Sequence, residues 1–261
     1  MSGGQKPITV AACLLKRNCL FVEAVERLES FAAFEAFLRR PGPWIGGFDF
    51  PFSLSRELVR DLGWPAPWQA LVSHCGTFSR LEFRKALDAY RASRPAGRKY
   101  AHRATDLPAG SSSPMKLVNP PVALMFHEGA RRLLDAGVHL PGLHEPSASR
   151  VALEAYPGLL VRRQLGIRAS YKSDARSEHT PQRRAARRAV IRALQAAQPL
   201  GIRVRMPRTI ERALAADGAG DLLDAVICAT QAAWAATRPR YGLPEEAFRG
   251  EGWIVSAGAI S

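Results

Sequence analysis

Two carboxylates stand inside apolar segments, where an ionised group needs a partner to offset its lost hydration. Asp49 comes near the end of the apolar run 44–52, and Glu154 lies within the run 151–156. If the first run is a strand, Gly47 and Asp49 share one face, and the glycine leaves room for a ligand. Structural alternatives remain open: Asp49 could cap the following turn, and Glu154 could pair with one of the many arginines.

Two further carboxylates, Asp221 and Asp224, open the apolar segment 221–237 and would share one face of a helix. Asp221 could instead cap that helix, with Asp224 completing a weak capping box. A divalent cation would satisfy all these groups, and Mg²⁺ suits a few carboxylates completed by water and phosphate oxygens. Two such ions can clamp the attacking and leaving oxygens of a phosphodiester. We therefore predict a site for Mg²⁺ or Mn²⁺ that draws on Asp49, Glu154, Asp221 and Asp224.

The basic residues are unevenly distributed. The chain has 37 Lys and Arg against 23 Asp and Glu, a net charge of +14, and residues 162–212 hold 14 basic residues and three acidic ones. Such a stretch attracts a phosphate polymer through counterion release, so we predict DNA or RNA as the partner. A solvated arginine-rich helix face is the alternative. The predicted contacts are Lys116, Lys172, Arg183, Arg184, Arg187 and Arg188.

Several familiar sites are absent from the sequence. The four cysteines form no C-x-x-C pair and the histidines complete no zinc pattern, which argues against a zinc finger or a disulfide-rich scaffold. There is no G-x-S-x-G, Walker lysine or G-x-G-x-x-G. No apolar run approaches the roughly 18–20 residues of a membrane span. Residues 1–7 have no apolar core, so we expect no signal peptide and a cytoplasmic protein without membrane contact.

The elements that must position these residues follow from periodicity and from Gly and Pro breaks. Strands are expected at 7–13, 19–25, 44–52, 150–156 and near 250–255, and helices at 29–40, 54–63, 122–137, 158–166, 181–198, 207–217 and 221–237. Strands that give way to helices favour an α/β fold. We predict one α/β domain over 1–261, with a long loop insertion at about 91–121 that is either functional or mobile.

Five segments occur in an order that is fairly specific when taken together. They are 46–52 (GGFDFPF), 153–158 (LEAYPG), 170–173 (SYKS), 221–226 (DLLDAV) and 251–255 (EGWIV). With the intervening 113–121 (SPMKLVNPP), they resemble the predicted nuclease family called domain of unknown function 429, of the ribonuclease H-like superfamily. The resemblance runs from about residue 6 to residue 255.

The resemblance implies a ribonuclease H-like fold, in which helices flank a mixed β-sheet, and a metal-dependent nuclease or related phosphodiester-processing enzyme. Asp49, Glu154 and Asp224 would be its acidic catalytic residues, and Lys172 and Lys116 its basic ones. Two alternatives stay open. One is a catalytically impaired nucleic-acid-binding protein of the same fold, and the other is a small-molecule phosphotransferase of the same superfamily.

One departure from the family concerns the amino-terminal end. Family members generally open with an apolar strand that ends in Asp, and in this fold that central strand supplies the first metal ligand. Only residues 1–5 precede Lys6 here, and no Asp precedes Asp49. The resemblance therefore implies either a start further upstream or the loss of one ligand and one core strand, and we favour the upstream start.

Overall fold

The protein contains two small β-sheets, and the computed structural model describes residues 6–146 and 149–258. In the first sheet, β1 (Ile8–Lys16) and β2 (Cys19–Leu28) form an antiparallel hairpin, and β5 (Arg203–Arg205) runs parallel to β2. The polar turn between β1 and β2 is the one that the sequence predicted. The short strand β5 was not predicted, because three residues carry too little periodicity.

The second sheet is a parallel pair, β3 (Trp44–Phe48) and β4 (Arg150–Glu154). Both strands were predicted, although each ends earlier than expected. The strand expected near 250–255 is reduced to a single bridge between Ile254 and Glu154. In the described part of the chain β1 pairs only with β2 and β3 only with β4, so one edge of each strand is unpaired.

Helices make up most of the remaining structure. They are α1 (Phe31–Leu38), α2 (Arg56–Asp61), α3 (Trp68–Cys75), α4 (Arg80–Ser93), α5 (Asp106–Ala109), α6 (Val122–Asp135), a π-helix (Leu159–Gln164), α7 (Pro181–Gln195), α8 (Arg208–Ala216) and α9 (Asp221–Ala236), with 3-10 turns at Arg176–Glu178, Pro239–Gly242 and Glu245–Arg249. Side chains of Ser30, Ser55, Ser79 and Thr180 accept backbone N–H groups at four helix starts, which explains where these helices begin.

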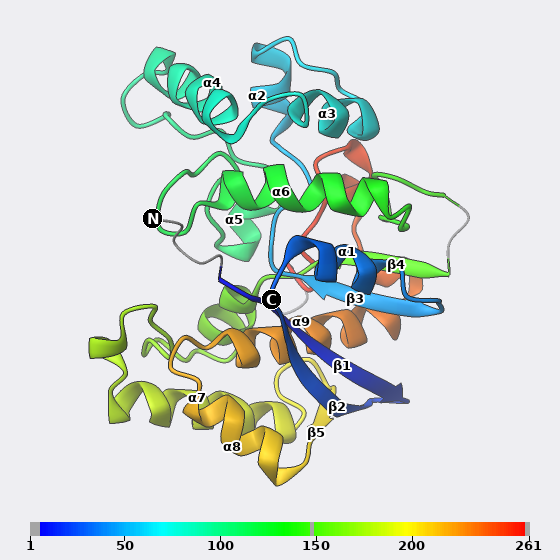
Figure 1. The fold of residues 1–261 in the computed structure, drawn as a ribbon, viewed down its shortest axis with the longest axis vertical. Coiled ribbons are helices and arrows are strands. Elements are labelled where there is room, and N and C mark those ends of the chain that lie inside the picture. The colour runs from blue at the N-terminus through cyan, green and yellow to red at the C-terminus, as the bar shows by residue number, and fades with distance from the viewer. Residues whose placement is uncertain (1–5, 147–148, 259–261) are drawn as a thin grey trace.

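The β3–β4 sheet and α9 lie between two groups of helices (Figure 1). Helices α2, α3 and α4 lie at one end of the molecule, and α7 and α8 lie at the other. Each end has its own hydrophobic core, one centred on Phe83, Phe126 and Leu133 and the other on Val190, Leu214 and Ile227. The structure is therefore a mixed α/β fold, which confirms the predicted fold class at that level.

The segment 91–121 is largely irregular, but part of it is buried. It begins in the last turn of α4, contains α5, and buries Arg103, Thr105 and Asp106. Sequence analysis missed this burial because Arg, Ser and Pro are typical of exposed loops. It also missed α3 and α4, which follow the Trp/Pro turn at 64–68. Across 6–146 and 149–258, no helix has the length and apolar character needed to cross a bilayer.

Candidate functional site

A cavity of about 1810 Å³ lies between β1, β3 and α9. Nearly every residue from Lys6 to Leu15 and from Pro43 to Pro51 lines it, together with small residues of α9 such as Ala225 and Ala232. The structure brings all the predicted acidic residues and both predicted lysines to this one cavity, namely Asp49, Glu154, Asp221, Asp224, Lys116 and Lys172. Their immediate contacts differ, and those contacts decide which of them is available to a ligand.

Asp49 directly follows β3, which packs closely on α9. A Cβ added at Gly47 would come within 2.3 Å of the Cys228 carbonyl oxygen, so only glycine permits this approach. The Asp49 side chain has no hydrogen bond or ion pair to any residue in the described ranges. Burial, and next the charge of Asp224, raise the pKa of Asp49 to about 7. Asp49 is therefore a partly buried carboxyl without a direct partner in the described ranges, and the nearby charge of Lys172 opposes the rise in its pKa.

Asp224 lies in the first turn of α9 and is 8% exposed. The Tyr171 hydroxyl donates to its Oδ1 at 2.5 Å, and the Lys172 ammonium binds its Oδ2. Burial raises the pKa of Asp224, while Lys172 and the two hydrogen bonds oppose that rise. Burial lowers the pKa of Lys172, but the hydrogen bond to Asp224 and the charges of Asp224, Asp49 and Asp221 together raise it.

Glu154 has an arginine partner. The Arg103 guanidinium donates to both Glu154 oxygens at 2.7 and 2.8 Å, and the Phe52 N–H donates to Oε2 at 3.0 Å. Both side chains of this pair are almost fully buried. Glu154 therefore takes the structural alternative left open by the sequence: it ties the segment around Arg103 to the end of β4.

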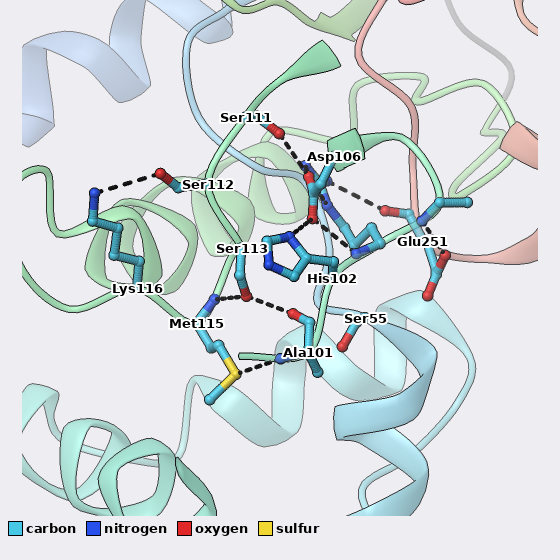
Figure 2. Close-up of polar contacts among 12 residues, drawn as sticks. Ser55, Ala101, His102, Asp106, Ser111, Ser112, Ser113, Met115, Lys116 and Glu251 are labelled. Carbon is cyan, nitrogen blue, oxygen red and sulfur yellow. Dashed lines mark hydrogen bonds and ion pairs between the residues drawn. The ribbon is translucent and has the colours of Figure 1, made fainter. Parts of the chain in front are cut away.

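The same guanidinium contacts a second carboxylate in a network that Figure 2 shows in part. Arg103 Nη2 donates to Asp106 Oδ1 at 3.0 Å, and Ser111 donates to that oxygen at 2.9 Å. Glu251 accepts the backbone N–H of Ala104 at 3.0 Å. Sequence reasoning missed Arg103 and Asp106, and the only signal was their place in a segment already marked as unusual.

The remaining predicted residues lie at the rim of the cavity. Asp221 begins α9 and pairs with Lys6, which also pairs with Asp174. Lys116 donates to Ser112 at 3.4 Å (Figure 2). A search of residues 6–146 and 149–258 finds no group of three or more His, Cys, Asp or Glu side chains placed to hold a metal ion. The four acids thus line one cavity without forming a single ligand cluster.

The predicted nucleic-acid contacts divide into exposed and buried arginines. Arg184 and Arg188 are exposed on α7, and Arg183 is partly exposed and pairs with Glu178. Arg187 is only 2% exposed and donates to the carbonyls of Tyr171 and Ala215 at 2.7 and 3.0 Å. We therefore assign Arg187 to the structure around the site and leave it out of the proposed nucleic-acid contacts.

The fold and the cavity define a mixed α/β protein with a buried acidic site beside a basic helix. The chain belongs to the family described as "Protein of unknown function (DUF429)", whose family model matches residues 7–247. This match confirms the family that the five motifs indicated. Comparison with curated proteins and with solved structures gave no match.

Proposed function

We propose that this protein is a metal-dependent nuclease or related phosphodiester-processing enzyme that acts on nucleic acid. The observation that carries the proposal is the unpartnered Asp49 carboxyl next to Asp224, in a cavity that extends to Lys172 and the segment before α7. A carboxyl with a raised pKa, beside a second carboxyl and a lysine, is typical of a site that binds a cation or moves a proton. The exposed arginines of α7 supply a surface for a phosphate backbone.

The residues present fit a magnesium or manganese ion. Mg²⁺ is commonly held by one or two carboxylates, with water and substrate phosphate oxygens filling its other positions. Asp49 has both oxygens free of protein partners in the described ranges, and Asp224 would share the ion. When bound, such an ion supplies Lewis-acid stabilisation of a phosphoryl oxygen. Glu154 already has Arg103 as a partner, so we propose no ligand role for it.

The other residues of the site have roles that follow from their contacts. Lys172 is 42% exposed, so its ammonium can hold Asp224 and still meet a phosphate oxygen that enters the cavity. Lys116 faces the same cavity from the segment before α6 and offers a second phosphate contact. Asp49, with its pKa near neutrality, can accept a proton when no cation is present.

We also infer that the fold is of the ribonuclease H-like type and that the cavity between β1 and β3 is the place of its central strand. Both strands have an unpaired edge there, and Leu14 and Ile45 remain 43% and 41% exposed in the cavity. β1 starts near Asp221, at the end of the cavity where β3 stops. A strand that preceded β1 in a hairpin would therefore run parallel to β3.

A form of the chain extended at its amino-terminal end by one added strand tests this inference. Hydrogen exchange should slow at the unpaired edges of β1 and β3, and the melting temperature should rise, because the added strand would pair with both edges. An extension of equal length with a central proline serves as the control. Equal exchange rates in all three proteins would exclude the central strand from this cavity.

Calorimetric titration with Mn²⁺ and Mg²⁺, followed by cleavage assays on labelled DNA and RNA, tests the function itself. We expect binding and metal-dependent cleavage that are both lost in Asp49→Asn and Asp224→Asn. Asp135→Asn, on the exposed surface of α6, is the matched control and should behave as the wild type. Cleavage that survives in Asp49→Asn would refute the proposal.

A nucleic-acid-binding protein without catalysis is the second candidate. It is favoured by one observation, the absence of a third metal-ligand side chain grouped with Asp49 and Asp224 in the described residues. This candidate predicts salt-sensitive binding to DNA or RNA that needs no metal. Binding without any metal uptake in the titration would select it over the enzyme.

A further inference from the structure

Both oxygens of Asp224 are held by two consecutive residues. Tyr171 reaches Oδ1 through its hydroxyl, and Lys172 reaches Oδ2 through its ammonium. Two adjacent side chains can bind the two oxygens of one carboxylate only if the backbone at Tyr171 and Lys172 is fixed, because each side chain must point in a set direction. Gly220 contributes to this fit, since a Cβ there would lie 2.6 Å from the Cβ of Lys172.

The backbone of this segment is fixed from α7. Arg187 Nη1 donates to the Tyr171 carbonyl at 2.7 Å, and Arg183 Nη1 donates to the Lys172 carbonyl at 2.9 Å. The two arginines are four residues apart, so they lie on one face of the helix. Arg187 Nε also donates to the Ala215 carbonyl at 3.0 Å, which joins α7, α8 and the segment at one point.

Packing alone does not explain why a buried position such as 187 holds an arginine. Arg187 is 2% exposed and forms no ion pair in the described ranges, and of the carboxylates only the charge of Asp217 is seen to act on it, without contact. A buried charge without a counterion costs more than an apolar side chain of similar size. A planar guanidinium, however, can hold two carbonyls in a fixed relative position, whereas an apolar residue offers no donor and a lysine ammonium sits on a flexible stem.

We propose that Arg187 is a positioning residue for the candidate site, which holds the Tyr171 carbonyl so that Tyr171 and Lys172 present Asp224 to the cavity. The expected effect on metal binding rests on the proposed function, whereas the positioning of Asp224 does not. The route is Arg187 to the Tyr171 backbone, then the Tyr171 hydroxyl to Asp224. Exposed arginines of the same helix are the proposed nucleic-acid contacts, so α7 carries both the substrate surface and the support of one carboxylate.

A double-mutant cycle between Arg187 and Tyr171 tests the route. The four proteins are the wild type, Arg187→Lys, Tyr171→Phe and the double variant, and Arg187→Gln is measured beside them in case the lysine variant does not fold. The first readout needs no metal: the ¹³C resonance of the Asp224 carboxyl, which reports its hydrogen bond from Tyr171. The second readout is Mn²⁺ affinity, and the third is the melting temperature.

We expect Arg187→Lys to shift the Asp224 resonance as Tyr171→Phe does, and the double variant to shift it no further. Mn²⁺ affinity should fall 10- to 100-fold in each single variant and in the double variant alike, as for other groups that orient a ligand. Arg150→Lys is the matched control, because Arg150 also holds two carbonyls, those of Leu38 and Ala136, far from Asp224. It should change the melting temperature alone.

The outcomes separate this inference from the proposed function. An Asp224 resonance that stays unchanged in Arg187→Lys and Arg187→Gln, or independent shifts that add in the double variant, would overturn the positioning role. If the resonances couple as expected but the wild type binds no Mn²⁺, the positioning role stands and the metal-dependent function fails.

Discussion

Asp49 is the residue on which the candidate site depends most, because its carboxyl lies partly buried beside Asp224 and has no direct partner in the described ranges. Sequence reasoning selected Asp49 from its place at the end of an apolar run, and the structure gives that run the expected strand geometry as far as Phe48. The sequence could not show that Asp224 would be its neighbour, because that contact depends on how α9 packs on β3.

The pH dependence of stability should reveal Asp49. Its pKa is 3.8 in a free chain and about 7 in the folded protein, so the folded state holds the proton more tightly. The contribution of the protonated Asp49 carboxyl to the free energy of unfolding is fully present below about pH 4 and is lost as the pH rises to about 7. The loss is at most about 4 kcal/mol, and it should disappear in Asp49→Asn. Urea unfolding at pH 5 and pH 8 measures it, and an identical pH dependence in both proteins would contradict the assignment.

Glu154 should behave as a structural residue. Glu154→Gln removes one carboxylate from the buried pair with Arg103 and should lower the free energy of unfolding by about 3 kcal/mol. Glu245→Gln, which removes an exposed partner of Arg240, is the control and should leave stability unchanged. Metal affinity, corrected for the unfolded fraction, should match the wild type. A protein of full stability that has lost metal binding would show instead that Glu154 is a ligand.

The sequence could have suggested a partner for Glu154 but not its identity. Arg103 is 51 residues away and lies in a segment that looked exposed. With 37 basic residues in the chain, composition alone cannot select one of them. Residue-level chemistry was therefore predictable where it depended on local pattern, and not where it depended on a distant partner.

At the scale of elements, the contact between β3 and α9 sets the spacing of the two carboxylates. Gly47→Ala would force its Cβ against the Cys228 carbonyl, and backbone atoms cannot move aside as a side chain can. We expect a loss of about 1–3 kcal/mol in unfolding free energy and weaker metal binding, because β3 must shift and carry Asp49 with it.

The neighbouring glycine is the control for this prediction. Gly46→Ala meets the edge of the Phe48 ring at 2.9 Å, and that ring can turn away. It should therefore cost less stability and leave metal affinity unchanged. Equal effects of the two substitutions on calorimetric metal binding would show that the β3–α9 approach does not position Asp49.

Elements with strong periodicity were predictable from the sequence, and the others were not. The hairpin, β3, β4, α6, α7, α8 and α9 all fall where the apolar pattern and the Gly and Pro breaks placed them. Helix α4 was missed even though Ser79 and Glu82 form a capping box at its start. Segment 91–121 is largely irregular, but the burial of Arg103 and Asp106 within it was missed because Arg, Ser and Pro are typical of exposed loops.

At the scale of the whole molecule, the net charge indicated a basic surface but could not show which arginines are exposed on it. The exposed positions on α7 include Arg184, Arg188 and Arg192. Replacing these three by Gln should weaken nucleic-acid binding and reduce the slope of log K against log salt by about 0.9 for each duplex phosphate that the protein no longer neutralises. Fluorescence anisotropy measured from about 50 to 200 mM salt gives the slope.

The control for that experiment removes the same charge elsewhere. Arg84, Lys85 and Arg91 of α4 lie at the opposite end of the molecule from α7 (Figure 1). Changing them to Gln lowers the net charge equally and should leave the slope near its original value. A slope that falls as much in this variant would mean that binding follows total charge rather than the α7 surface.

The two hydrophobic cores give the candidate site an unusual dependence on temperature. Phe48 and Phe50, on either side of Asp49, pack on the core of α1–α6, whereas Leu223 and Val226, beside Asp224, belong to the core of α7–α9. The two carboxylates are thus anchored in different halves of the molecule. Any rotation of one half against the other would separate them, so we expect heating to abolish metal uptake several degrees below the unfolding transition.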